Sequence, residues 1–213
     1  MLTHLAPALS LLLVTADAAP NAERIEFSLW PDGVRLGMTK EELMVARPEA
    51  KTTGMAMDDR PGPDDNDVAS DFTDPGAAHM FFIVDGRVEM VAITSSPRAE
   101  KPAKVFDVAV RELGRPTRRI VLERTMPVSG GDEKVDRLPV LAWDHPDHPE
   151  LSIRLRVDST PARASLMVST PRMSSIRQLR ELPYDAERDE ALFAAIDEAL
   201  EAALAVPAAA SDD

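Results

Sequence analysis

The stretch Gly33-Val-Arg-Leu-Gly-Met-Thr-Lys-Glu-Glu-Leu43 combines a turn, a strand end and a helix start in adjacent residues. Thr39 and Glu42 have the spacing of a capping box, in which the hydroxyl accepts a helix N–H and the carboxylate accepts the Thr39 amide. Met38 before the cap and Leu43 at the fourth helical position can form a hydrophobic staple. We therefore expect a helix that begins directly after Thr39.

The Asp85-Gly86 pair predicts a β-hairpin between strands at residues 79–84 and 87–94, because a type I′ turn needs positive φ at both turn positions. A short first strand is expected at 25–29. Four later strands are expected at 118–124, 138–143, 151–157 and 163–169, the last three as a meander. Within 151–157, Arg154 and Arg156 alternate with hydrophobic residues, which places the two arginines on the opposite face of the strand.

Helical spacing of hydrophobic residues predicts further helices at 101–113, ended by Gly114, and at 185–205, with a short one at 174–182. Residues 55–75, rich in aspartate, predict a mobile acidic loop. The first helix ends at Ala46-Arg47-Pro48 and the second at Gly114-Arg115-Pro116, and each is followed by a variable segment and antiparallel strands. This shared plan indicates either an internal duplication or a chance resemblance. We expect an α+β fold of two tandem helix-on-antiparallel-sheet modules, 19–98 and 99–172, followed by a C-terminal helical segment at 173–206 and a disordered tail at 207–213.

Residues 1–18 have the pattern of a signal peptide. An apolar run over residues 5–14 precedes Ala16-Asp17-Ala18, a small-x-small cleavage site. The run is shorter than the ~20 residues that span a bilayer, so we expect an exported, periplasmic or extracellular protein with no membrane span. Because no cysteine is present to accept a lipid, we expect no lipid anchor. A short buried helix is the alternative reading of this segment. The chain has no cysteine, which excludes disulfides, thiolate catalysis and thiolate zinc sites.

Charge is distributed unevenly along the chain. The formal net charge is −13, with −9 in residues 1–86, +5 in 87–180 and −9 in 181–213. An acidic chain does not favour general nucleic-acid binding, which needs exposed Lys and Arg against the phosphates. The basic middle segment is either neutralised by the acidic ends of the same molecule or forms a face for an acidic partner.

Residues 33–43, together with Phe81-Phe82-Ile83-Val84-Asp85-Gly86-Arg87-Val88, resemble the small exported modules of the SmpA-like outer-membrane assembly lipoproteins. They are also similar to the tandem modules of the beta-lactamase inhibitory protein family. The resemblance covers residues 25–95, and residues 101–169 only in outline. It implies a helix packed on a short antiparallel sheet, a non-enzymatic role and protein partners. The anchoring cysteine of the lipoproteins and the disulfides of the inhibitory family are absent.

Four candidate metal ligands, Asp144, His145, Asp147 and His148, lie within five residues. Imidazole and carboxylate groups are ligands for divalent metals, and a site here would suit a metal-dependent hydrolase. The two prolines in and directly after this segment instead favour a polar hairpin loop between strands. The chain has no Walker loop, dinucleotide fingerprint or His-Glu-x-x-His sequence, and we expect no cofactor.

The leading functional prediction is an exported, non-enzymatic protein-binding or inhibitory module whose partner is another exported protein. Its surface would be a basic sheet face formed by Arg87, Arg118, Arg154, Arg156 and Arg163. Positive charge on such a face would steer an acidic partner towards it. The alternatives are the metal-dependent hydrolase and a small-ligand carrier, which would need an apolar cavity.

Overall fold

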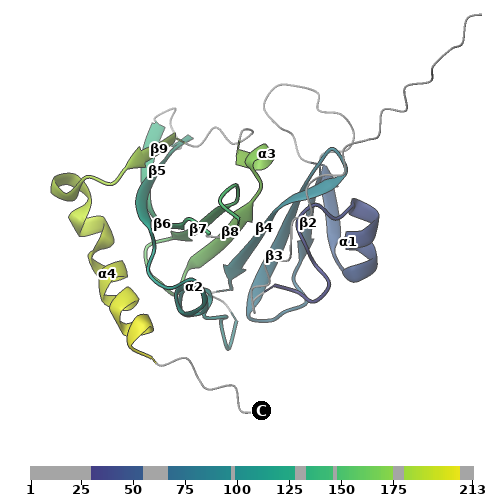
Figure 1. Cartoon of the computed structure of the whole chain (residues 1–213), viewed down its shortest axis with the longest axis horizontal. Coiled ribbons are helices and arrows are strands. Elements are labelled where there is room, and N and C mark those ends of the chain that lie inside the picture. Colours follow the sequence, from purple (N-terminus) through teal and green to yellow (C-terminus); the bar gives the residue numbers. More distant parts are fainter. Residues whose placement is uncertain are drawn as a thin grey trace, which may run out of the picture.

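The computed structural model describes residues 30–54, 67–96, 99–127, 133–145, 148–174 and 180–206, which contain one curved antiparallel sheet with helices around it (Figure 1). The helices are α1 (Lys40–Ala46), α2 (Val105–Leu113), α3 (Pro171–Ser174) and α4 (Ala186–Ala205). The nine strands are β1 (Lys51–Gly54), β2 (Asp67–Asp71), β3 (Ala77–Val84), β4 (Arg87–Ser95), β5 (Arg118–Pro127), β6 (Glu133–Trp143), β7 (Ser152–Val157), β8 (Ala164–Ser169) and β9 (Arg180–Pro183). The expected α+β class with a C-terminal helix is confirmed.

The strand order is β1-β2-β3-β4-β8-β7-β6-β5-β9. In each half of the chain one helix, α1 or α2, precedes four consecutive antiparallel strands, and the second set lies in the reverse order of the first. The halves join where β4 pairs with β8, from Met90 opposite Ser169 to Thr94 opposite Ser165. The sheet therefore continues without interruption through both halves, and β9 adds a ninth strand beside β5.

Three helices cover the convex face of the sheet (Figure 1). α2 contacts β4, β8 and α4, while α1 contacts β4 and α4 contacts β6. Buried side chains of these helices, including Leu43, Phe106 and Phe193, join one hydrophobic cluster with strand residues from both halves. On the concave face, α3 is the one helix of the described residues that packs there, with Met173 against Met90 and Met167.

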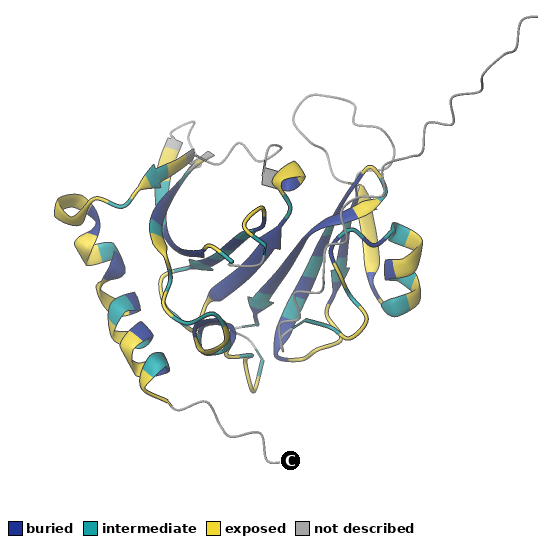
Figure 2. Cartoon of the chain, in the orientation of Figure 1, coloured by how far each residue is buried: buried dark blue, intermediate teal, exposed yellow. Residues whose placement is uncertain are grey.

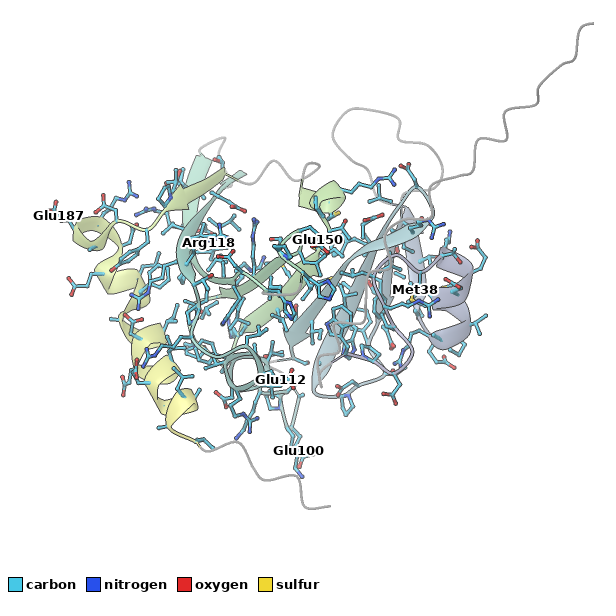
Figure 3. All side chains as sticks on the ribbon, viewed as in Figure 1. Met38, Glu100, Glu112, Arg118, Glu150 and Glu187 are labelled. Carbon is cyan, nitrogen blue, oxygen red and sulfur yellow. The ribbon has the colours of Figure 1, made fainter. Side chains whose placement is uncertain are left out.

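The local signals around α1 and the first hairpin are confirmed. Thr39 Oγ1 accepts the Glu42 amide at 3.2 Å, and Glu42 Oε2 accepts the Thr39 amide at 2.8 Å, which completes the capping box. Met38 is buried, and Figure 3 shows it between α1 and the sheet. Asp85 and Gly86 have φ values of 47° and 74°, as a type I′ turn between β3 and β4 requires.

The two longer predicted helices are present. α4 begins after Asp185, whose Oδ1 accepts the Glu187 amide at 3.1 Å. α2 ends at Leu113 with Gly114, at φ 71°, as its C-cap, but it begins at Val105 rather than at residue 101. The amide of Ala103 donates to the Gly76 carbonyl at 2.8 Å, so the residues before α2 hold the start of β3 instead of extending the helix.

Two strands lie where the sequence predicted other structure. β2 lies within the predicted acidic loop at 55–75, and its end residues Asp67 and Asp71 pair with Lys40 and Arg47 at the two ends of α1. β9 overlaps the end of the predicted helix at 174–182 and pairs with β5. Both predictions were wrong at these residues because a partner distant in sequence, and not the local pattern, decides the conformation.

Several predictions fall outside the described residues: the signal peptide at 1–18, the first strand at 25–29 and the tail at 207–213. Among the helices in the described ranges, none has the length and apolar character needed to cross a bilayer.

Candidate functional site: the concave face of the sheet

The concave face brings together three of the five predicted arginines. Directly paired residues of neighbouring strands share a face, so the register defines rows of neighbouring side chains. Two such rows cross β5, β6, β7 and β8, and they are Arg118–Ala142–Arg154–Met167 and Ile120–Val140–Arg156–Ser165. The arginines are thus interleaved with small and apolar residues. Figure 3 shows Arg118 on the part of the sheet that β5 forms.

Two of these arginines have carboxylate partners close in the sheet. Arg118 Nη2 lies 2.8 Å from Asp144 Oδ1, and Arg156 Nη2 lies 3.0 Å from Asp158 Oδ2. The Arg118 and Asp144 side chains are each 58% exposed, and ion pairs that water reaches contribute little to stability. A binding partner can therefore exchange its own carboxylate for that of Asp144 at low cost.

The third arginine, Arg154, pairs with a residue on a strand that is not adjacent to its own strand. Arg154 lies on β7 and Glu181 on β9, with β6 and β5 between them. Neighbouring strands are about 4.8 Å apart, so three spacings in a flat sheet would separate these strands by roughly 14 Å. Arg154 Nη1 nevertheless contacts Glu181 Oε1, because the sheet curves strongly between the two strands (Figure 1). The ion pair therefore crosses the hollow of the concave face.

A cavity of about 260 Å³ lies beside this ion pair. Its apolar wall consists of Met90, Ile120, Leu122, Val140, Met167 and Met173. Its polar groups belong to Ser152, Arg154, Ser169 and Glu181. Each residue of the apolar wall is buried, and Figure 2 shows the strands around the hollow largely in dark blue. An apolar cavity with a few converging polar groups has the composition of a small-molecule site.

The other two predicted arginines lie away from this hollow. Arg87 begins β4, and its Nη1 donates to the Gly37 carbonyl at 2.8 Å, which ties the β3–β4 hairpin to the turn before α1. Arg163 is exposed in the connection between β7 and β8, where its carbonyl accepts the Asp158 amide at 2.8 Å. The structure thus brings Arg118, Arg154 and Arg156 together and places Arg87 and Arg163 at hairpin ends.

The predicted metal loop connects β6 with β7. The rings of His145 and His148 lie with their centroids 5.2 Å apart, and His148 Nδ1 lies 3.5 Å from Glu150 Oε1. Asp144 is paired with Arg118. Asp147 lies outside the described residues, and among those that are described no three His, Asp or Glu side chains are grouped to hold a metal ion. Metal binding at this loop stays a prediction.

A buried glutamate at the edge of the concave face, beside α3, was not predicted. Glu89 is 7% exposed, and it accepts a hydrogen bond from the Thr170 hydroxyl and lies 4.0 Å from Arg172 Nη1 of α3. Burial raises the pKa of Glu89 above its ordinary value, against the opposing effects of the Thr170 hydrogen bond and the charge of Arg87. These contacts help to fix α3 over the concave face.

The cavity was also missed, although part of its pattern is visible in the sequence. Because successive side chains of a strand point to opposite faces, Met90 lies on one face of the predicted strand in 87–94 and Met167 on one face of that in 163–169. Their proximity depends on the β4–β8 pairing, which joins residues more than seventy positions apart.

Comparisons of the chain with protein-family models, with curated proteins and with solved structures found no match.

Proposed function

We propose that this protein is an exported, non-catalytic binding protein, and that the concave face of its sheet binds another exported protein. One observation carries the proposal: α1, α2 and α4 all pack on the convex face, while the concave face presents Arg118 and Arg156 beside buried apolar residues. A broad concave surface with apolar side chains between charged ones suits a protein partner. Export rests on the signal-peptide pattern of residues 1–18.

The charge pattern suggests which partner fits. The arginines of the concave face are held by Asp144, Asp158 and Glu181 of the same chain. Carboxylates of an acidic partner would pair with Arg118 and Arg156, and water would solvate the displaced side chains of Asp144 and Asp158 because both are at least partly exposed. Such an exchange favours specificity and encounter rate over affinity, and the affinity would come from the apolar residues between the arginines.

We also infer that the two halves are tandem modules. The support is the repeated plan of one helix followed by four antiparallel strands, with the two sets meeting at the β4–β8 pair. This plan agrees with the resemblance to SmpA-like and inhibitory-protein modules, in which protein binding is the expected role.

Affinity capture tests the proposal. Immobilised protein is exposed to the exported fraction of its own cell, and retained proteins are identified by mass spectrometry. We expect a saturable partner that free protein displaces and that elutes as ionic strength rises. Retention should fall at least about tenfold for Arg154→Ala/Arg156→Ala, because removing these arginines would leave the carboxylates of the bound partner buried without a cation.

The matched control is Arg111→Ala/Arg115→Ala, which removes the same charge at the exposed end of α2 on the convex side. This control should retain the partner fully. Binding that ignores both ionic strength and the Arg154→Ala/Arg156→Ala change would contradict the proposed face.

Two alternatives have their own tests. A metal-dependent hydrolase at the His145–His148 loop requires bound zinc or nickel that His145→Ala/His148→Ala abolishes, as measured by elemental analysis. A small-ligand carrier is favoured by a specific observation, the cavity of about 260 Å³ beside Arg154.

A further inference from the structure

We infer that the cavity on the concave face binds a small zwitterion with an apolar side chain, of the class of free α-amino acids. The carboxylate of the ligand would pair with Arg154, its ammonium group with Glu181, and its side chain would lie against the methionine-lined wall. This inference deepens the small-ligand alternative above and does not require a protein partner.

The Arg154–Glu181 ion pair determines the charge of the ligand. Both side chains are partly withdrawn from water, at 29% and 35% exposure. A ligand with only a carboxylate would take Arg154 and leave Glu181 without its cation, and an amine would do the reverse. Leaving one member of a partly buried pair uncompensated is costly. A zwitterion replaces one ion pair with two, so both protein charges stay neutralised.

The polar residues around the pair add to this recognition. Ser152 on β7 and Ser169 on β8 are directly paired in the sheet, and both line the cavity with Arg154. Their hydroxyl groups can donate to a carboxylate that the guanidinium holds. Glu181 lies on the four-residue edge strand β9, which has β5 as its one neighbour among the described strands. Glu181 can therefore move aside for a ligand with less disruption than a residue of a central strand.

The apolar wall determines the size and shape of the ligand's side chain. Met90, Met167 and Met173 come from β4, β8 and α3, and unbranched methionine side chains adapt to the shape of an apolar group. The cavity of about 260 Å³ lies below the usual range for drug-sized ligands, which begins near ~300 Å³. Leucine and methionine are thus suitable probes, while glycine has no side chain to occupy the wall.

The test is isothermal titration calorimetry of the dialysed full chain with leucine, methionine, glycine and two analogues of leucine. 4-Methylpentanoate lacks the ammonium group, and 3-methylbutylamine lacks the carboxylate. We expect saturable binding of leucine or methionine, and binding at least about tenfold weaker for both analogues and for glycine. Absence of binding by leucine and methionine would overturn the inference, as would equal affinity for 4-methylpentanoate.

Variants locate the binding site. Arg154→Gln and Glu181→Gln should each weaken leucine binding at least about tenfold, whereas Arg115→Gln, in the exposed pair with Glu201, should not change it. Unchanged binding in both cavity variants would overturn the assignment. The analogue series uses the unaltered protein, so a variant that fails to fold leaves the test intact. Amino-acid binding and protein capture are separate measurements, and failure of one leaves the other proposal standing.

Discussion

Asp71 illustrates how one buried carboxylate joins two segments of the chain. Its Oδ1 accepts the amide and hydroxyl of Thr73 at 2.9 and 2.7 Å, and its Oδ2 accepts Arg47 Nε at 2.7 Å. Burial alone would raise the pKa of Asp71, but the hydrogen bonds from Thr73 and Arg47 and the charge of Arg47 outweigh it and lower that pKa. Because Arg47 is the C-cap of α1, this carboxylate fastens α1 to β2.

We expect Asp71→Asn to lower the free energy of unfolding at pH 7 by about 2 kcal/mol, since Arg47 would lose a partly buried charge partner. The carboxylate stabilises the fold fully above its unfolded pKa of about 3.9, and this contribution is lost as pH falls through the lowered pKa of the folded state. Urea unfolding at pH 7 and in steps below about pH 4 measures the effect. The difference between parent and variant should shrink in acid, and a constant difference would contradict this account. The exposed control Asp32→Asn should have little effect.

At the scale of the element, α1 packs on the sheet through a narrow stripe. Leu43 is fully buried, whereas Val45, two positions later, is 83% exposed. Leu43→Ala should lower the free energy of unfolding by about 3 kcal/mol through lost burial and a residual cavity. Val45→Ala should change it by no more than about 0.5 kcal/mol. Urea unfolding of the two variants measures both values. Equal losses of unfolding free energy in the two variants would show that the packing of α1 on the sheet does not depend on Leu43.

The elements that the sequence predicted correctly have local causes. The Thr39 cap, the Asp85-Gly86 turn and the stop at Gly114 each act through groups a few residues apart. The conformations of β2 and β9 depend on residues that are distant in sequence. The ends of β2 form ion pairs with Lys40 and Arg47, and β9 pairs with β5. The same division applies to the candidate site. Alternation placed Arg154 and Arg156 on one face, whereas the contact of Arg154 with Glu181 depends on curvature that no local pattern encodes.

At the scale of the whole molecule, the continuous sheet and the shared core predict cooperative unfolding of both halves. β4 pairs with β8 across the junction, and one hydrophobic cluster contains Leu43 of the first half and Phe193 of the last helix. Two tryptophans report on the halves: Trp30 packs against this cluster before α1, and Trp143 at the end of β6 donates to the Gly114 carbonyl at 3.0 Å.

Single-tryptophan variants test this cooperativity. In Trp30→Phe the fluorescence reports the second half, and in Trp143→Phe it reports the first half. Within each variant we expect the urea midpoints from fluorescence and from far-ultraviolet circular dichroism to coincide, as a two-state transition requires. A fluorescence midpoint displaced from the circular-dichroism midpoint would show that the two halves of the chain unfold independently.

The two outer strands limit growth of the sheet by addition of further chains. β1 and β9 are only four residues long, and the last residue of β9 is Pro183, which has no amide hydrogen to offer. β1 begins with the charged Lys51 and ends with Gly54, and all four of its residues are exposed. Short edges that carry lysine or proline are poor templates for another strand. The nine-stranded sheet of the described residues thus resists edge-to-edge association with further copies of the chain, so we expect the protein to stay dispersed at high concentration.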